Sequence, residues 1–428
     1  MMSRFQSFTV FLLLFVTLLP VRLVIAQEYK FKADLDSFIN LPGAYKLTPD
    51  DLDKMFEKGS LSMNPYFEWL TKDRSRAIFK RKPAGNVLVD MTIVGGEVPV
   101  QEMIVDFKDG LYLGTTISIF NRGDAGSMSV EEFNKSFMAV GKHLGKQLAA
   151  RPNRRQGNIK RGVLTSGYTW ISARGMAVLE YNPGVKSQNQ KVEFLRMRLC
   201  RRDAKGSYAA AMQERAAASV RQSELPRNVK KDGEGNVYVS NIPMVDQGGK
   251  GYCVVASVQR LFEYYGVPCD MHQLADIADA DPERGTSSVN TNKELGAIDH
   301  LFKMRYACLA VSHNRRLVEP IEENGKLYIK NGAKSWDLKD FQKVIRKYAN
   351  LGVPLLWSLQ LGPEFKEDPP LSEQTSGGHM RLIIGYNDDT ERILFSDSWG
   401  AGHELKSMAM EDAIRATSAL FLMKPVTN

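Results

Sequence analysis

The chain has 428 residues, 43% of them hydrophobic, and a formal net charge of +8. This length allows two or more domains, each with its own core, and excludes a single small globule. The charge is uneven, because residues 141–230 carry 14 more basic than acidic side chains. This segment predicts either contact with an anionic surface or a solvated face and linker. We expect no nucleic-acid partner, since neither an aromatic-rich single-strand motif nor a recognition helix accompanies the charge.

Residues 1–26 have the layout of a cleaved secretory signal peptide. Arg4 precedes an apolar run over residues 8–19, and small residues follow before the expected cleavage site. Pro20 and Arg22 interrupt the apolar run, whereas a membrane-spanning helix needs about 20 apolar residues in succession. No later segment is apolar enough to span a membrane. We therefore expect a secreted, periplasmic or cell-envelope protein with no transmembrane segment after signal removal.

Residues 27–82 are predicted to form a helical lead segment, with patterns such as TPDDLDKMFEKG. From residue 83 the periodicity becomes that of strands, and short β-branched runs separated by Gly, Pro or Asp-Gly indicate an antiparallel meander. Ser129 and Glu132 have the spacing of a capping box, which predicts a helix to about Ala150. Further strand-like runs follow. We therefore expect residues 83–201 to form a separate α+β accessory domain.

Residues 202–235 are predicted to be a helical, basic linker. An alanine-rich stretch precedes the polar run ELPRNVKKDGEGN, which marks a domain boundary and an exposed site that a protease could cut. The run GDAGSMSVEE lacks the alternating acidic ligands of a calcium loop, and we find no metal-ligand spacing or phosphate-binding loop elsewhere. The sequence therefore predicts neither a metal nor a cofactor.

Four cysteines occur in the chain, and none forms a C-x-x-C pair: Cys200, Cys253, Cys269 and Cys308. This spacing argues against a zinc knuckle or a thioredoxin-type motif. Disulfides can form in an exported protein. If Cys253 stays reduced for chemistry, at most one disulfide is possible, and Cys269 with Cys308 is a candidate pair.

Cys253 stands where the glycine-rich loop DQGGKGYC turns into a segment of helical periodicity. A cysteine at a helix start lies at the positive end of the helix dipole, which favours the nucleophilic thiolate. Gln247 precedes it by six positions. If the loop folds back, the Gln247 side-chain amide and the Cys253 backbone amide could both donate to an oxyanion.

His379 and Asp397 lie in two strand-like runs near the C-terminus, GGHMRLIIGY and ILFSDSWG. Adjacent strands would bring the imidazole and the carboxylate together, so that the carboxylate orients the ring while its other nitrogen faces the thiol. Taken singly, the histidine could be a strand end bonded to backbone and the aspartate a turn former. Their order and context together predict a nucleophile, a base and an orienting carboxylate.

These motifs resemble the papain-like cysteine peptidases. In that family a glutamine precedes the nucleophile by the same interval, a Gly-His enters a strand ending in Gly-Tyr, and the orienting residue lies in an Asn-Ser-Trp-Gly stretch. Here Asp397 replaces the asparagine, Tyr252 and Val254 flank the nucleophile, and 126 residues separate Cys253 from His379, against roughly 130 to 150 in the papain group. These departures, together with LKDFQKVIRKYANLGVPLLWSL read as a helix, a turn and a strand, make the sequence more similar to the branch of the bacteriocin-leader-processing peptidases. That branch uses Cys, His and Asp, but bacteriocin processing is not implied, because the usual fused transporter is absent.

The resemblance implies that residues 236–428 form a papain-like cysteine peptidase domain with a helical half and an antiparallel-sheet half. The expected function is cleavage of a peptide or protein substrate. The implied roles are nucleophile for Cys253, base for His379, orienting carboxylate for Asp397 and oxyanion donor for Gln247. Trp399 is a candidate shield for the histidine, and residues 362–378 are a candidate mobile rim of the cleft. Two alternatives stay open: an acyltransferase or amidase on a related fold, and a non-catalytic envelope binding protein that retains the fold.

Overall fold

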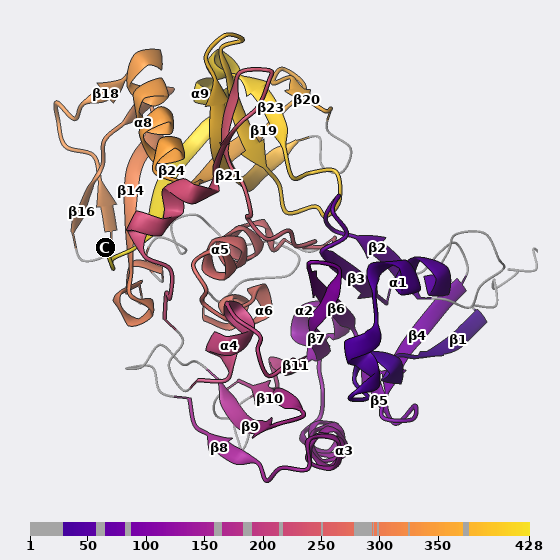
Figure 1. Ribbon diagram of the computed structural model, residues 1–428. Helices are drawn as coiled ribbons and strands as arrows, with labels where there is room; N and C mark the ends of the chain where they lie inside the picture. Colours follow the sequence, from indigo (N-terminus) through magenta and orange to yellow (C-terminus); the bar gives the residue numbers. More distant parts are fainter. Residues whose placement is uncertain are drawn as a thin grey trace, which may run out of the picture.

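The computed structural model contains two lobes of sheet and helix that lie side by side (Figure 1). It describes residues 29–56, 65–81, 87–157, 165–182, 191–213, 217–249, 251–277, 293, 295–297, 299–323, 326–370 and 376–428. The predicted signal peptide, residues 1–26, lies outside the described residues. Within these ranges, no helix is both long and apolar enough to cross a membrane.

The N-terminal lobe is built on an antiparallel eight-stranded sheet in the order β2-β3-β6-β7-β11-β10-β9-β8. Its strands are β2 (Tyr66–Trp69), β3 (Arg76–Lys80), β6 (Glu102–Lys108), β7 (Leu111–Asn121), β8 (Asn153–Arg155), β9 (Ser166–Ser172), β10 (Gly175–Tyr181) and β11 (Phe194–Cys200). A second, three-stranded sheet contains β1 (Tyr29–Asp34), β4 (Val87–Ile93) and β5 (Val98–Val100). The predicted meander is therefore only partly correct, because β4 leaves it and pairs in parallel with β1.

Helix α3 (Val130–Leu148) begins with the predicted capping box of Ser129 and Glu132, in which each side chain bonds the other residue's backbone amide. Its apolar face is buried against β9 and β10, where Phe133 meets Tyr181 edge-on with ring centroids 5.3 Å apart. The helix is thus held both by its own cap and by the sheet. The lobe also contains α1 (Pro49–Phe56), α2 (Arg122–Ala125) and the 3-10 turns η1 (Asp36–Phe38) and η2 (Gly43–Lys46).

Two boundary predictions are wrong in part. Residues 27–82 are not a helical segment throughout, because β2 and β3 form the edge of the large sheet and their aromatic side chains pack in its core, as Phe67 does on Phe79. Residues 202–235 are not a free linker throughout, although residues 230–235 are exposed as predicted. Earlier in the segment, Tyr208 of α4 (Ser207–Ala211) donates to Asp106 in the N-terminal lobe, whereas Leu225 of η4 (Gln222–Asn228) is buried in the C-terminal core.

The C-terminal lobe contains an 11-stranded sheet whose main path is β18-β15-β14-β24-β19-β21-β22-β23-β20, with β12 and β13 paired at its side. The strands are β12 (Val229–Lys231), β13 (Asn236–Val239), β14 (Met304–His313), β15 (Arg316–Val318), β18 (Ser335–Trp336), β19 (Leu355–Leu361), β20 (Glu367–Asp368), β21 (Gly377–Asn387), β22 (Arg392–Ser396), β23 (Lys406–Ala409) and β24 (Thr417–Pro425). A separate hairpin joins β16 (Ile321–Glu323) to β17 (Lys326–Tyr328). The helices are α5 (Cys253–Tyr264), α6 (Met271–Ile277), η5 (Asp299–Phe302), α8 (Leu338–Asn350) and α9 (Met410–Ala416). Helices and an antiparallel sheet thus share one core, as an α+β fold requires, and α8 and β19 confirm the predicted helix, turn and strand.

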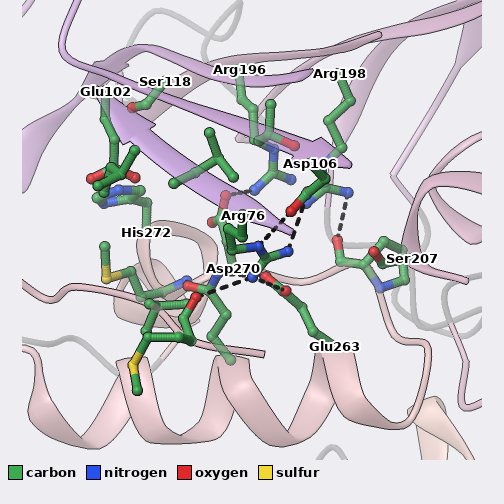
Figure 2. A pocket seen from close by; sticks show the side chains of 18 of the residues that line it. Arg76, Glu102, Asp106, Ser118, Arg196, Arg198, Ser207, Glu263, Asp270 and His272 are labelled. Atoms are coloured by element: carbon green, nitrogen blue, oxygen red, sulfur yellow. Dashed lines mark hydrogen bonds and ion pairs between the residues drawn. The ribbon is translucent and has the colours of Figure 1, made fainter. Parts of the chain in front are cut away.

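The two lobes meet through buried charges around a cavity of about 50 Å³ (Figure 2). Arg76 of β3 bonds Asp106 of its own lobe and Glu263 of α5, at 2.6 and 2.8 Å. Arg196 of β11 bonds Glu180 and also reaches Asp270 across the interface. Charges buried this deeply hold their partners in a defined arrangement. The basic charge of residues 141–230 is therefore not confined to the surface, because some arginines of this segment are buried and face Glu180.

Candidate active site

Helix α5 begins at Cys253, which confirms the predicted helix start, and Tyr252 is its N-cap residue. The helix is buried on almost every side, between the C-terminal sheet and the N-terminal lobe. Cys253 itself is half-buried and lies at the N-terminal end of this helix. Gly248, with φ of +70°, allows the tight path of the loop before the helix.

His379 and Asp397 come together at the ends of neighbouring strands, as predicted. β21 and β22 pair antiparallel with Leu382 opposite Ser396, so the residue after Ser396 reaches the imidazole. The His379 Nε2 atom lies 2.7 Å from Oδ1 of Asp397, and both side chains are almost completely buried. This bond fixes the ring orientation and leaves Nδ1 as the other nitrogen of the ring.

The Cys253 thiol affects the electrostatics of the imidazole, although no described residue hydrogen-bonds the His379 Nδ1 atom. Burial lowers the pKa of His379, but the Asp397 carboxylate and, after it, the Cys253 thiol raise it to about 9. Burial also raises the pKa of Asp397, yet the positive charges of His379 and Arg381 hold that pKa well below its ordinary value. At neutral pH the carboxylate is therefore ionised and the imidazole protonated. His379 and Asp397 therefore form a hydrogen-bonded pair, and Cys253 is near enough to raise the pKa of that histidine.

Gln247 is buried and is held by the residue that follows Asp397. Its backbone N–H donates to the Ser398 carbonyl at 2.8 Å, and its side-chain oxygen accepts from the Ser398 hydroxyl at 2.7 Å. With the oxygen bonded to Ser398, the donors of this side chain are the two N–H groups of its NH2. From the N-terminal lobe, Lys80 pairs with Asp246 at 2.5 Å and anchors the same loop.

Two arginines that the sequence reasoning missed surround the aspartate. Arg381 Nε donates to Asp397 Oδ2 at 2.6 Å, and Arg260 donates to the Asp397 carbonyl at 2.7 Å. The signal for Arg381 was its place two residues after His379 on one strand, because such residues share a face. Arg260 lies seven residues after Cys253 in α5, two helical turns along the same face.

Trp399 stacks on the His379 ring, with centroids 4.4 Å apart and planes inclined by 20°. It is half-buried and covers one face of the imidazole. The predicted mobile rim is only partly correct. Glu367, within it, is buried and belongs to β20, which pairs with β23, so this part of the segment is fixed. Residues 371–375 of the segment lie outside the described residues.

A cavity of about 640 Å³ lies beside Gln247 and Trp399. Its opposite wall comes from the N-terminal lobe, through residues of β2, β3 and β6 that include Glu68, Lys80 and Glu102. A molecule in this cavity would therefore contact both lobes. No group of three or more His, Cys, Asp or Glu side chains in the described ranges could hold a metal ion.

All four cysteines are free thiols, so the candidate disulfide between Cys269 and Cys308 is wrong. Burial raises the pKa of Cys308 to about 12 and that of Cys269 still further. Burial likewise raises the pKa of Cys200 to about 12. Cys200 and Cys269 lie inside packed cores and Cys308 is half-buried against the C-terminal core, so at neutral pH these thiols remain protonated.

Comparison with known proteins finds a family model that matches residues 239–417. These residues match the model of the Peptidase_C39 like family, and the match includes the positions of Cys253, His379 and Asp397. No curated protein matches the sequence. Among solved structures, the chain is similar to xylellain, a cysteine protease from Xylella fastidiosa, at 15% identity and a TM-score of 0.26. That similarity covers 49% of this chain and 92% of xylellain.

Proposed function

We propose that this protein cleaves peptide bonds with Cys253 as nucleophile. The match of residues 239–417 to the Peptidase_C39 like family supports a cysteine-type peptidase. His379 is the proton carrier, Asp397 the orienting carboxylate and Gln247 the oxyanion donor. The observation that carries the proposal is the 2.7 Å hydrogen bond between His379 and Asp397, together with the effect of the Cys253 thiol on the pKa of the same imidazole. A nucleophile, a base and an orienting group in such contact are the arrangement that acyl transfer needs.

The reaction starts from a thiolate and an imidazolium. With a pKa of about 9, His379 carries a proton at neutral pH, so the attacking form that we propose for Cys253 is the thiolate beside an imidazolium. The sulfur attacks the scissile carbonyl carbon, and the oxygen becomes an oxyanion that the Gln247 amide and the Cys253 backbone amide stabilise. His379 then gives its proton to the leaving amine as the C–N bond breaks, which produces a thioester.

Water completes the reaction. The neutral imidazole, still oriented by Asp397, takes a proton from water while the water oxygen attacks the thioester carbonyl. When the C–S bond breaks, the acid product leaves and the thiolate–imidazolium pair is restored. Trp399 supports both steps, because its ring covers one face of the imidazole and limits the access of other water to it.

The test compares Cys253→Ala with Cys308→Ala, since both remove a half-buried thiol. We expect the first variant to lose hydrolysis of a fluorogenic protein substrate such as labelled casein, and to lose labelling by a thiol-directed peptidase inhibitor. The second should keep both. Circular dichroism of the two variants checks that the fold is retained. Undiminished hydrolysis by the Cys253 variant would refute the proposed nucleophile.

We also propose that the protein acts outside the cytoplasm. The support is the charge, apolar run and small residues of the first 26 residues. Expression of the full chain should yield a mature protein that begins near Gln27, which mass spectrometry of the N-terminal peptide would detect. Retention of residues 1–26 in all fractions would contradict export.

The exposed part of the basic segment is proposed to contact anionic surfaces of the envelope. Arg151 and Arg154 are exposed, unlike the arginines of this segment that lie buried between the lobes. Electrostatic contact weakens with ionic strength. Binding to vesicles with anionic lipid, but not to neutral vesicles, that falls as salt is added would support this contact. Equal binding to both vesicles would contradict it.

A further inference from the structure

The imidazole–carboxylate pair continues into the interior through three further charged side chains. Asp397 Oδ2 accepts from Arg381 Nε at 2.6 Å, and Arg381 Nη1 donates to Glu367 Oε2 at 2.6 Å. Glu367 Oε1 in turn lies 2.5 Å from Nζ of Lys406. All of these side chains are almost completely inaccessible to solvent. With the imidazolium of His379, they form a chain of five groups whose charges alternate in sign.

We propose that Arg381 is a positioning residue for the peptidase reaction: it holds the Asp397 carboxylate towards the His379 ring, and Glu367 and Lys406 hold Arg381. This inference rests on the proposed function, and it assigns a role outside the nucleophile, base and orienting carboxylate. The three residues come from β21, β20 and β23, so the whole sheet edge contributes to the alignment of one carboxylate.

The geometry requires an arginine at this position. Its planar guanidinium donates from Nε to one carboxylate and from Nη1 to the other, which a lysine ammonium cannot do with the same fixed directions. The plane is further restrained because the Arg381 Cζ atom lies over the Phe395 ring at 4.6 Å and over the Trp399 ring at 5.6 Å. Trp399 also stacks on His379, so arginine and imidazole share this indole as a neighbour.

The positive charge of the buried Arg381 also affects the protonation of His379. The groups near the imidazole are the Asp397 carboxylate, the Cys253 thiol and the Trp399 ring. His403 meets that ring edge-on, and Arg381 lies behind the carboxylate. A cation behind the carboxylate opposes a second cation on His379, and burial makes this repulsion stronger than in water. Removal of the Arg381 charge should therefore stabilise the imidazolium, whereas removal of the Glu367 charge should destabilise it.

The experiment measures kcat and KM for Arg381→Met, Arg381→Lys and Glu367→Gln. It also measures the basic limb of the pH profile, which is the fall in kcat/KM at high pH as the His379 imidazolium loses its proton. We expect Arg381→Met to lose about 10- to 100-fold in kcat, the range for one hydrogen bond to a charged group, with KM changed by less than about twofold. Its basic limb should move to higher pH. The Lys variant should return the limb to the wild-type position but recover only part of kcat. The limb of Glu367→Gln should move to lower pH.

Arg196→Met is the matched control, because Arg196 is buried and also bridges two carboxylates, those of Glu180 and Asp270. It lies in the lobe interface, so we expect a loss of stability without a shift of the basic limb. A basic limb that stays in place in Arg381→Met would overturn the proposal, whatever the loss of kcat. If that variant does not fold, an unmoved limb and unchanged kcat in both Arg381→Lys and Glu367→Gln would overturn it.

A second readout separates this inference from the proposed function. The rate of Cys253 alkylation by iodoacetamide against pH, followed by mass spectrometry of the Cys253 peptide, reports the thiolate–imidazolium pair without a substrate. If the wild-type protein neither cleaves casein nor shows such a pH-dependent pair, the proposed function itself fails. If the wild type shows both and the Arg381 variants match it, only the role of Arg381 is refuted.

Discussion

The Ser398 hydroxyl donates to the side-chain oxygen of Gln247 over 2.7 Å, and so joins residues that are 151 positions apart in the sequence. Ser398 also donates its backbone N–H to the Asp397 carboxylate at 2.8 Å. One residue therefore sets the direction of the proposed oxyanion donor and of the orienting carboxylate. The two halves of the site cannot move independently without loss of one of these hydrogen bonds.

Gln247→Ala should lower kcat by roughly 10² to 10³, because a preorganised donor to the oxyanion is lost. KM should change little, since the donor acts on charge that develops during the reaction. Steady-state kinetics on one fluorogenic peptide measures both constants. Gln101→Ala is the control, because Gln101 lines the same cavity from the N-terminal lobe. Equal kcat values for the two variants would remove Gln247 from the oxyanion site.

Asp397→Asn should shift the basic limb of kcat/KM from about pH 9 to lower pH. The Asp397 charge is the largest influence that raises the pKa of His379, and burial, which lowers that pKa, remains in the variant. The imidazolium is then lost at lower pH as the pH rises. Rates between pH 6 and about 10 locate the limb. A limb that stays near pH 9 would mean that another group controls the proton.

Thiol reagents should modify one cysteine of the folded protein near pH 7. Burial raises the pKa of Cys200 and Cys308 to about 12 and that of Cys269 further, so these thiols stay protonated and shielded. Cys253 is half-buried at a helix start. Titration with a disulfide reagent before and after unfolding should count one and then four thiols. Rapid reaction of a second thiol in the native state would contradict the burial.

Arg196→Ala should destabilise the protein by about 3 to 5 kcal/mol, because it leaves the buried carboxylates of Glu180 and Asp270 without this cation. Denaturant unfolding monitored by tryptophan fluorescence gives the free energy of unfolding. Arg154→Ala removes an exposed arginine from the same lobe and should have an effect within about 0.5 kcal/mol. Similar losses in the two variants would show that the interface charges contribute little.

Acid should weaken the lobe interface within a defined range of pH. Burial raises the pKa of Glu180, but Arg196, Arg155 and Arg198 outweigh it and lower the pKa to about 2, against 4.5 in the unfolded chain. The stability from this group is present above pH 4.5 and is lost as the pH falls towards 2. Unfolding free energies at pH 5 and 3 should differ less in Glu180→Gln than in the wild type. An identical difference would assign acid sensitivity elsewhere.

The sequence by itself determined the features that depend on neighbours along the chain. The start of α5 at Cys253, the capping box of α3 and the antiparallel pair β21 and β22 all follow from local periodicity and capping chemistry. Local patterns sufficed because the energies of caps and amphipathic faces are set within a few residues. They also led to three of the candidate residues, since Cys253 begins α5, His379 lies near the start of β21 and Asp397 directly follows β22.

Only the tertiary structure decided which distant groups share an environment. The parallel pairing of β1 with β4 and the burial of Leu225 from the supposed linker depend on contacts between remote segments. Arg381 looked like one more charge in a strand, and its bond to Asp397 became visible only when β20, β22 and β23 enclosed it. Charge interactions depend on distance and burial in space, and no spacing along the sequence encodes either.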